Sequence, residues 1–332
     1  MSHATEGEKV RFGVVGLGSY VARVAVIPAL RRSPYAELVA ISTTTGPRDD
    51  FELHGDERLL FGVEEILSDD SVEALYLPLP NDLHLEFIER SLETGKHVLC
   101  EKPITTTAAE LAALNEVVHS SQFIVAEAFM TAYHRRVNEV IAMAQANRFG
   151  EVISISSSFT GQLEPLDGYR TVAARGGGSL WDIGIYALYP VLEIFGPTPQ
   201  RVAVSSIDRF LPPIDTTFEA LLSYEGGRSA HIRTSFTAGE SQRLEIVGTE
   251  AIATVERAST PLFTDRTIEI TTRSGDRELV TVEGCDPYQA MVDEVSLAFR
   301  STREPRWNHT RSVQMNELLL RLSTELDTVR NH

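Results

Sequence analysis

The fold of this chain is decided by residues 10–34, VRFGVVGLGSYVARVAVIPALRRSP. The first six residues form a short apolar run that is typical of a buried strand. Gly16 and Gly18 follow, and a helical pattern then extends to about Leu30, with Pro28 as the point where the helix kinks or restarts. A strand, a glycine turn and a helix form the first unit of a dinucleotide-binding fold, in which a pyrophosphate lies at the helix N-terminus.

Strand-like and helical segments alternate from there to about residue 125. The further strands are predicted at residues 37–42, 72–77, 97–100 and 123–126, with helices at about 83–94 and after residue 107. Thr107 and Glu110 have the spacing of a capping box for the second of these helices. This alternation over short loops predicts a parallel, doubly wound sheet of the α/β class. We therefore expect residues 1–125 to form an N-terminal Rossmann dinucleotide-binding domain.

The pattern changes near residue 125. Residues 152–160 alternate apolar and polar side chains, which favours a half-buried antiparallel strand. Further strands are predicted at residues 201–206, 217–224, 229–236, 243–247, 267–272 and 278–282, with hairpin turns at 226–227 and 274–275. Two helices, from 287 and from about 311, close the chain. We expect residues 126–332 to form an α+β domain for substrate binding and oligomerisation, with a large, mostly antiparallel open sheet.

Composition excludes several classes of protein. The 332 residues include 47 acidic and 30 basic side chains, and the net charge of −17 argues against nucleic acid as a partner. An anionic cofactor must then be held by local donors. No apolar run approaches the ~20 residues that span a bilayer, and the polar N-terminus lacks a signal-peptide core. Cys100 and Cys285 make no disulfide framework, and no cluster has zinc-ligand spacing. We expect a cytoplasmic protein without metal.

The glycine turn is a weak motif when it is considered alone. Gly16 and Gly18 allow a tight turn and a close approach of the backbone to a pyrophosphate. The usual third small residue is missing, because Val21 stands there and Ala22 follows. An ordinary glycine turn is the alternative, but the preceding strand and the position near the chain start favour cofactor binding.

The end of the second strand bears on the choice of cofactor. NAD enzymes carry an acid there for the ribose 2′-hydroxyl. This chain has Ser42 and Thr43 instead, with Arg48 nearby as a partner for a 2′-phosphate. The pattern favours NADP(H); the alternative is a solvated loop that recognises neither cofactor.

Leu79, Pro80 and His84 follow the next strand, at an edge where open α/β sheets bind ligands. They could face the nicotinamide ribose. Alternatively, the prolines here only end a strand and His84 only starts a helix.

Glu101-Lys102-Pro103 directly follows the fourth predicted strand. A lysine beside a cofactor can protonate a forming alkoxide as the ammonium, or accept a proton as the amine. An exposed lysine without a role is the commoner outcome, but the position at a strand end favours catalysis. Pro103 invites a cis peptide that would aim the lysine.

Asp182 and Tyr186 are four residues apart and share one helical face. A carboxylate can orient a substrate hydroxyl, and a phenol can donate a hydrogen bond. The glycine run 176–178 before them permits a tight approach to a ligand. Alternatively, the acid only complements a helix N-terminus and the tyrosine only packs. With Lys102, the pattern predicts a nicotinamide-dependent carbonyl reductase or alcohol dehydrogenase. No nucleophile elbow supports a hydrolase.

Together these motifs resemble the family of glucose–fructose oxidoreductase, inositol dehydrogenase and their relatives. The matching stretches are GVVGLGSYVARVAVIPALRRSP, PLPNDLHLEFIERSLETGKHVLCEKPIT, VAEAFM and GGGSLWDIGIYALYPVLEIFG, together with residues 288–325. The inositol branch has a histidine where Tyr186 stands. The chain therefore looks more like the branch with glucose–fructose oxidoreductase, dihydrodiol dehydrogenase and sugar-nucleotide ketoreductases. It looks most like the C-3 ketoreductases of dTDP-deoxysugar biosynthesis of the dTDP-L-digitoxose type.

This resemblance implies NADPH-dependent reduction of the 3-keto group of dTDP-3,4-diketo-2,6-dideoxyglucose to dTDP-4-keto-2,6-dideoxyglucose, in antibiotic sugar biosynthesis. It implies cofactor contacts from Gly16, Leu17, Gly18, Ser19, Tyr20, Ser42, Thr43, Leu79, Pro80, His84, Glu101, Lys102 and Arg170. Lys102, Tyr186 and Asp182 would be catalytic and would contact the sugar. Tyr20, Arg233 and Ser235 are further candidates for binding the nucleotide sugar.

Two points stay open beside this resemblance. The sheet face of Arg233 could equally form a subunit interface, since relatives commonly assemble through the open sheet as homodimers or homotetramers. The activity could also be that of a free-sugar or trans-dihydrodiol dehydrogenase, or the chain could be a non-catalytic NADP-sensing regulator like the yeast galactose-pathway repressor.

Overall fold

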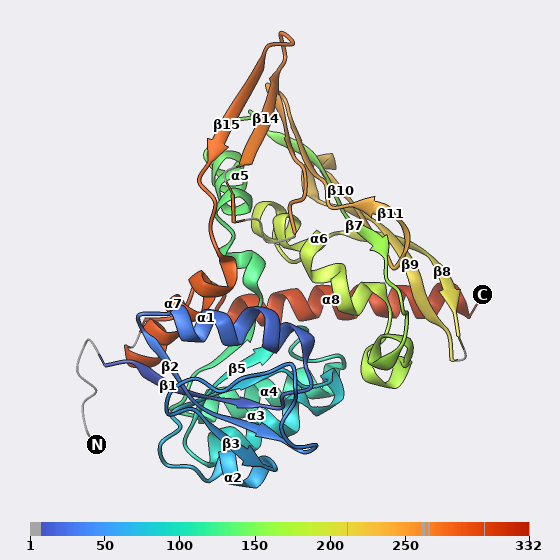
Figure 1. Ribbon diagram of the computed structural model, residues 1–332. Coiled ribbons are helices and arrows are strands. Elements are labelled where there is room, and N and C mark those ends of the chain that lie inside the picture. The colour runs from blue at the N-terminus through green and yellow to red at the C-terminus, as the bar shows by residue number, and fades with distance from the viewer. Residues whose placement is uncertain (1–7, 211, 260–262, 265, 302, 332) are drawn as a thin grey trace. The chain divides into compact units, whose positions relative to one another are not determined.

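The computed structural model describes residues 8–210, 212–259, 263–264, 266–301 and 303–331 (Figure 1). The chain divides into two compact units. The first unit comprises Met1–Tyr133 and Pro287–Ser312, and the second comprises His134–Asp286 and Val313–His332. Helix α8 (His309–Arg330) begins in the first unit and continues in the second.

The first unit is built on a six-stranded parallel sheet, which confirms the predicted Rossmann architecture. Its strand order is β3-β2-β1-β4-β5-β6. The strands are β1 (Val10–Val15), β2 (Ala36–Thr43), β3 (Arg58–Phe61), β4 (Ala74–Leu77), β5 (His97–Glu101) and β6 (Val125–Ala128). The chain runs outward from β1 to β3 and then returns to β4, so the strand order reverses between β1 and β4. Ligands of such sheets bind at this reversal, beyond the carboxyl ends of the strands.

The helices of the first unit follow the sequence signals closely. They are α1 (Ile27–Arg32), α2 (Val63–Leu67), α3 (His84–Glu93), α4 (Ala108–Ser120) and α7 (Pro287–Arg300). Pro28 stands at the start of α1, after a π-helical turn at Ala22–Val26, so the predicted restart is confirmed. Thr107 and Glu110 form the predicted capping box. Strand β3 and helix α2 were not predicted, because both are short.

The second unit contains a nine-stranded sheet with the order β15-β14-β13-β12-β7-β10-β9-β8, and β11 pairs with β7. The strands are β7 (Val152–Gln162), β8 (Arg201–Arg209), β9 (Ile214–Ser223), β10 (Ser229–Ser235), β11 (Thr237–Ser241), β12 (Leu244–Gly248), β13 (Ala251–Val255), β14 (Arg266–Thr272) and β15 (Arg277–Val282). The expectation of a mostly antiparallel sheet is confirmed. One pairing differs: β7 is antiparallel to β12 but parallel to β10, so the sheet is mixed.

Helices α5 (Arg135–Gln145) and α6 (Ser179–Phe195) pack against this sheet, α5 on β14 and β15 and α6 on β7, β9 and β10 (Figure 1). Strand alternation sends every second side chain of β10 toward α6. Ala230, Ile232 and Thr234 are fully buried on that side. Among the described residues, no helix is both long and apolar enough to cross a membrane.

Candidate functional site

The turn after β1 is open to a ligand. Gly16 has a φ of +100°, a conformation that side chains other than glycine rarely adopt. Its N–H donates a hydrogen bond of 3.2 Å to Oγ of Ser42, which is buried at the end of β2. A side chain at Gly18 would meet no atom within 4 Å. The turn is therefore held from the neighbouring strand and leaves room for a phosphate beside its backbone, so these residues fit a dinucleotide.

Arg23 stabilises the same turn, a role that no sequence motif indicates. Its Nη1 donates to the carbonyl oxygens of Leu17 at 3.0 Å, Gly18 at 2.9 Å and Ser19 at 3.3 Å. Val21, the departure from the usual glycine pattern, is half-buried and directly precedes the π-helical turn. That short irregular segment replaces the regular first helical turn of the motif.

Two further predicted contacts near this turn differ in their setting. Ser19 Oγ accepts a hydrogen bond from the N–H of Ala22 at 3.3 Å, so it caps the following helical segment. Tyr20 is 70% exposed and leaves its ring available to a ligand.

The predicted 2′-phosphate loop has partners of its own. The Thr43 hydroxyl donates to the carbonyl of Gly46 at 3.1 Å. Arg48 Nε donates to the Asp50 carboxylate at 2.8 Å, and this contact raises the pKa of Arg48. Arg23 Nη2 also lies 3.7 Å from the Asp50 carboxylate. A cofactor phosphate would have to compete with Asp50 for Arg48.

His84 ties together two of the predicted site loops. The side chain is fully buried, with Nε2 2.9 Å from the carbonyl oxygen of Leu79 and Nδ1 2.9 Å from that of Pro103. Burial lowers the pKa of His84, while the carbonyl groups oppose that shift. Because one ring nitrogen lies 2.9 Å from a carbonyl oxygen of each loop, His84 bridges the loops that follow β4 and β5. Leu79 and Pro80 remain half-exposed at the end of β4.

Lys102 lies directly after β5 and is half-buried. Its backbone N–H donates to the Glu101 carboxylate at 3.2 Å, and the other Glu101 oxygen accepts from Tyr76 OH at 2.7 Å. The peptide between Lys102 and Pro103 is cis. Since β1, β2, β4 and β5 are parallel, the Gly16 turn, Ser42, Leu79 and Lys102 lie along one edge of the sheet.

A buried carboxylate, Glu127 on β6, holds the segment after Lys102. One Glu127 oxygen accepts from the N–H of Ile104 at 2.8 Å. The other accepts from Trp307 Nε1 and from Ser312 Oγ, both at 2.8 Å. Burial raises the pKa of Glu127, and the hydrogen bonds lower it. Glu127 lies in the matching stretch VAEAFM, but no role is predicted for it from the sequence.

In the second unit, the glycine run before α6 approaches the chain itself. A side chain at Gly177 would lie 2.8 Å from the carbonyl oxygens of Arg170 and Val172. One at Gly178 would lie 2.2 Å from Oδ1 of Asp215. The glycines therefore admit the 170–172 loop and a buried carboxylate, and a close approach of the run to a ligand stays a prediction.

Asp215 on β9 caps the start of α6. One of its oxygens accepts from Ser179 Oγ and from the N–H of Leu180, both at 2.8 Å. Burial raises the pKa of Asp215 to about 6. A carboxylate at a helix N-terminus satisfies N–H groups that lack partners inside the helix. Asp215 thereby fixes the turn that precedes Asp182.

Asp182 is buried and paired with Arg170. Arg170 Nε donates to the Asp182 carboxylate at 2.7 Å, and Tyr169 OH donates to it at 3.4 Å. The pKa of Arg170 is raised: burial lowers it, but the charge and hydrogen bond of Asp182, together with Tyr169 and Tyr186, outweigh this effect. One turn along α6, Tyr186 is half-buried and packs edge-on against Phe159, with ring centres 5.2 Å apart. The predicted acid and phenol therefore share one helix face, with an arginine that neutralises the acid.

The structure separates Arg233 and Ser235 from this cluster. Thr234 faces α6, since its hydroxyl lies 2.8 Å from that of Ser179. Arg233 therefore points to the opposite side of the sheet, where its Nε donates to Glu219 at 2.6 Å. Ser235 is 1% exposed, and its hydroxyl forms a hydrogen bond of 2.7 Å with the hydroxyl of Thr217. Arg233 thus lies on the sheet face away from α6, and the role of Arg233 and Ser235 at the nucleotide-sugar end stays a prediction.

A metal site in a protein needs clustered histidine, cysteine or acidic side chains. In the part of the chain that the structure describes, no three histidine, cysteine or acidic side chains gather as a metal-ligand group. The candidate reacting groups are Lys102 in the first unit, and Asp182 and Tyr186 in the second.

Comparison with known proteins identifies the family. Residues 10–129 match the description "Oxidoreductase family, NAD-binding Rossmann fold", and residues 137–254 match "GFO/IDH/MocA C-terminal domain". The chain belongs to the GFO/IDH/MocA oxidoreductase family. The resemblance inferred from the sequence is therefore confirmed.

Two relatives and one solved structure are informative. An NADP⁺-dependent D-xylose 1-dehydrogenase of Haloferax volcanii is 31% identical over 92% of this chain and 93% of its own length. A dTDP-3,4-didehydro-2,6-dideoxy-alpha-D-glucose 3-reductase of Actinomadura kijaniata is 28% identical over 99% and 97%. The structure of KijD10, a 3-ketoreductase of the same organism in complex with NADP and TDP-benzene, superposes with a TM-score of 0.85. It is 27% identical and covers 96% of this chain and 98% of that one.

Proposed function

We propose that this protein is an NADPH-dependent ketoreductase that reduces the C-3 keto group of a dTDP-linked 3,4-diketo-2,6-dideoxyhexose to give dTDP-4-keto-2,6-dideoxyglucose. The observation that supports it most is Lys102, half-buried at the same sheet edge as the Gly16 turn. The 3-reductase relative, similar over nearly its whole length, favours a nucleotide-linked ketosugar as substrate.

Several residues would hold the cofactor. The turn from Gly16 to Ser19 offers the backbone for the pyrophosphate, and the acid-free end of β2 at Ser42 and Thr43 favours NADPH over NADH. Leu79 and Pro80 would contact the nicotinamide side, with His84 fixing their loop. When bound, NADPH would supply a hydride to the carbonyl carbon of the sugar.

The remaining chemistry belongs to the side chains. The Lys102 ammonium donates a proton to the carbonyl oxygen as that oxygen gains negative charge. Asp182, held by Arg170, accepts a hydrogen bond from a sugar hydroxyl and orients the ring. Tyr186 donates a hydrogen bond to the same C-3 carbonyl or to the adjacent C-4 carbonyl. Tyr20 is a further contact for the nucleotide end of the substrate.

The test is Lys102→Ala, assayed by NADPH oxidation with the dTDP-linked diketosugar. We expect turnover to fall by about 10²-fold or more, the usual contribution of a general acid, while NADPH binding is retained. The sequence has three lysines, and exposed Lys9 in the same unit supplies the matched control, Lys9→Ala, with normal turnover. Normal turnover in the Lys102 variant would refute the proton-donor role.

A free-sugar dehydrogenase is the second candidate, because the D-xylose dehydrogenase relative is 31% identical over 92% of this chain. The two functions differ in whether the nucleotide is recognised. If the substrate is a nucleotide sugar, dTDP will inhibit competitively; absence of inhibition together with NADP⁺ reduction by D-xylose would establish the second candidate instead.

A further inference from the structure

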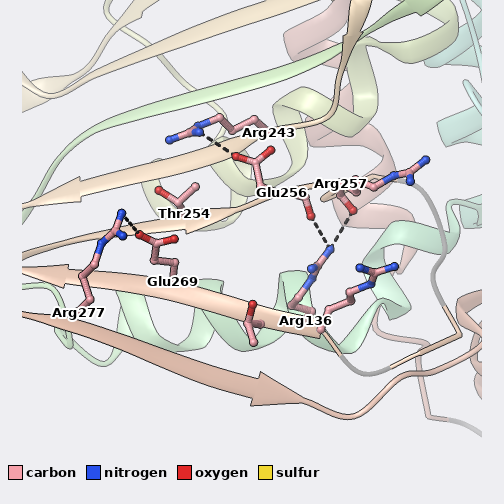
Figure 2. A pocket seen from close by; sticks show the side chains of 9 residues that line it. Arg136, Arg243, Thr254, Glu256, Arg257, Glu269 and Arg277 are labelled. Carbon is pink, nitrogen blue, oxygen red and sulfur yellow. Dashed lines mark hydrogen bonds and ion pairs between the residues drawn. The ribbon is translucent and has the colours of Figure 1, made fainter.

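A pocket of about 290 Å³ lies on the second unit, around the ends of β13 and β14 and the start of α5 (Figure 2). Among the described residues, its lining has five arginines, two glutamates and two threonines, and no apolar side chain. The arginines are Arg136, Arg243, Arg257, Arg266 and Arg277. In a chain with a net charge of −17, such a concentration of guanidinium groups needs a physical reason.

Three of these arginines are already neutralised. Arg243 pairs with Glu256 and Arg277 pairs with Glu269, each at 2.7 Å, which uses both carboxylates of the lining (Figure 2). Arg257 pairs with Glu240, outside the lining, at 3.2 Å. Surface ion pairs of this kind hold side chains in place but contribute little to stability.

Arg136 and Arg266 are different. Within the described ranges, no carboxylate lies within 4.0 Å of either guanidinium group. Arg136 is only 4% exposed; its Nη2 donates to the carbonyl oxygens of Glu256 at 2.7 Å and Arg257 at 2.9 Å, and its Nε has no hydrogen-bond partner among the described atoms. A buried guanidinium donor without an acceptor is costly and needs an explanation.

The two positive charges also act on each other. Burial lowers the pKa of Arg136, the charge of Arg266 lowers it further, and the charge of Glu256 opposes this only in part. Like charges that face one another in a partly dry pocket are stabilised by an anion that both can contact. The hydroxyls of Thr254 and Thr267, which also line the pocket, add neutral donors.

We propose that this pocket binds a small oxyanion of high charge density, a phosphate or pyrophosphate group, between Arg136 and Arg266. Guanidinium forks match phosphate oxygens in geometry and form charge-assisted hydrogen bonds. The part of the lining that the structure describes has no apolar side chain and so offers no surface for a base or an aliphatic chain. The ligand is therefore recognised by its phosphate alone, whether that phosphate is free or terminates a larger polar molecule.

The test is calorimetric titration of the full chain, saturated with NADPH, with pyrophosphate, orthophosphate and glucose 6-phosphate. Saturation with NADPH keeps these anions from the Gly16 turn. We expect pyrophosphate to bind with one site and with an affinity that weakens as salt is added. Stronger binding of glucose 6-phosphate than of orthophosphate would identify a phosphate that terminates a larger molecule, and the reverse would identify a free anion.

Arg266→Ala should weaken pyrophosphate binding about tenfold or more, since one charge-assisted contact is lost. Arg148→Ala is the matched control, because Arg148 pairs with Glu278 and lies outside the pocket lining; it should leave the affinity unchanged. Arg136→Met should abolish binding, and its circular dichroism and thermal melt show whether the unit still folds.

Two results would overturn the proposal. One is the absence of saturable pyrophosphate binding, or equal affinity in the wild type and in Arg266→Ala. The other is a change in sedimentation coefficient in Arg266→Ala with unchanged anion binding, which would make these arginines a contact between copies of the chain. Ketosugar reduction enters none of these measurements, so failure here leaves the proposed function intact.

Discussion

Asp215 is expected to make the protein less stable as the pH rises from about 4 to 6. Its folded pKa of about 6 exceeds the ordinary aspartate value of about 3.9 because the side chain is buried. Below pH 4, the carboxyl group is protonated in both states. Between the two values, the unfolded chain has already released a proton that the folded chain keeps, so raising the pH favours unfolding. Above pH 6, the loss is complete.

The size of the effect follows from the shift. A difference of about two pKa units, at about 1.4 kcal/mol per unit, corresponds to about 3 kcal/mol of unfolding free energy. Asp215→Asn removes this titration and keeps an oxygen that can accept from Ser179 and Leu180. We therefore expect the unfolding free energy of the wild type, minus that of Asp215→Asn, to fall by about 3 kcal/mol between pH 4 and pH 7.

This difference is measured by urea unfolding at several pH values. Tryptophan fluorescence and circular dichroism monitor the unfolding. Asp208→Asn is the control of opposite sign, because a hydrogen bond from Arg330 lowers the pKa of Asp208. For that variant the difference should rise with pH in the acid range and stay constant above it. If the difference for Asp215→Asn is flat or rises with pH, the burial argument is wrong.

Three further substitutions test the supports of the site. Glu127→Ala leaves the buried Trp307 indole N–H without its acceptor and should lower the unfolding free energy by about 3 kcal/mol, with a smaller loss in Glu127→Gln, as thermal melts would show. Gly178→Ala forces a side chain 2.2 Å from Asp215 and should cost about 2 kcal/mol or more in the same melts, whereas Gly226→Ala, also at positive φ but in open space, should cost less. Ser42→Ala removes the hydrogen bond to the glycine turn and should weaken NADPH binding about 2- to 10-fold in a fluorescence titration.

Sequence motifs predicted correctly those strands and helices whose formation depends on residues close together in the chain. The apolar run before Gly16 is a strand, Pro28 restarts its helix, and the Thr107 capping box is formed. The alternation of inward and outward side chains in residues 229–236 also predicted strand β10 correctly. The parallel pairing of β10 with β7 escaped prediction, because alternation is equal in parallel and antiparallel strands.

Contacts between distant residues explain the rest. Glu127 accepts from Trp307, 180 residues away, and nothing in VAEAFM marks that partner. The glycine run 176–178 indicates that something approaches the backbone closely, but the sequence does not show whether this is a ligand or another part of the chain. Asp215, 37 residues after Gly178, fills that space.

Glu127 and Asp215 act in similar ways, one in each unit. Each is a carboxylate on a strand, buried with a raised pKa, and each accepts the N–H of a residue two positions from a proposed reacting group. Glu127 holds Ile104 after Lys102, and Asp215 holds Leu180 before Asp182. Because a reacting group must be held to within a fraction of an ångström, backbone hydrogen bonds to a rigid strand fix its position better than a mobile loop does. Substitutions at either carboxylate should therefore lower kcat without contact between that carboxylate and substrate.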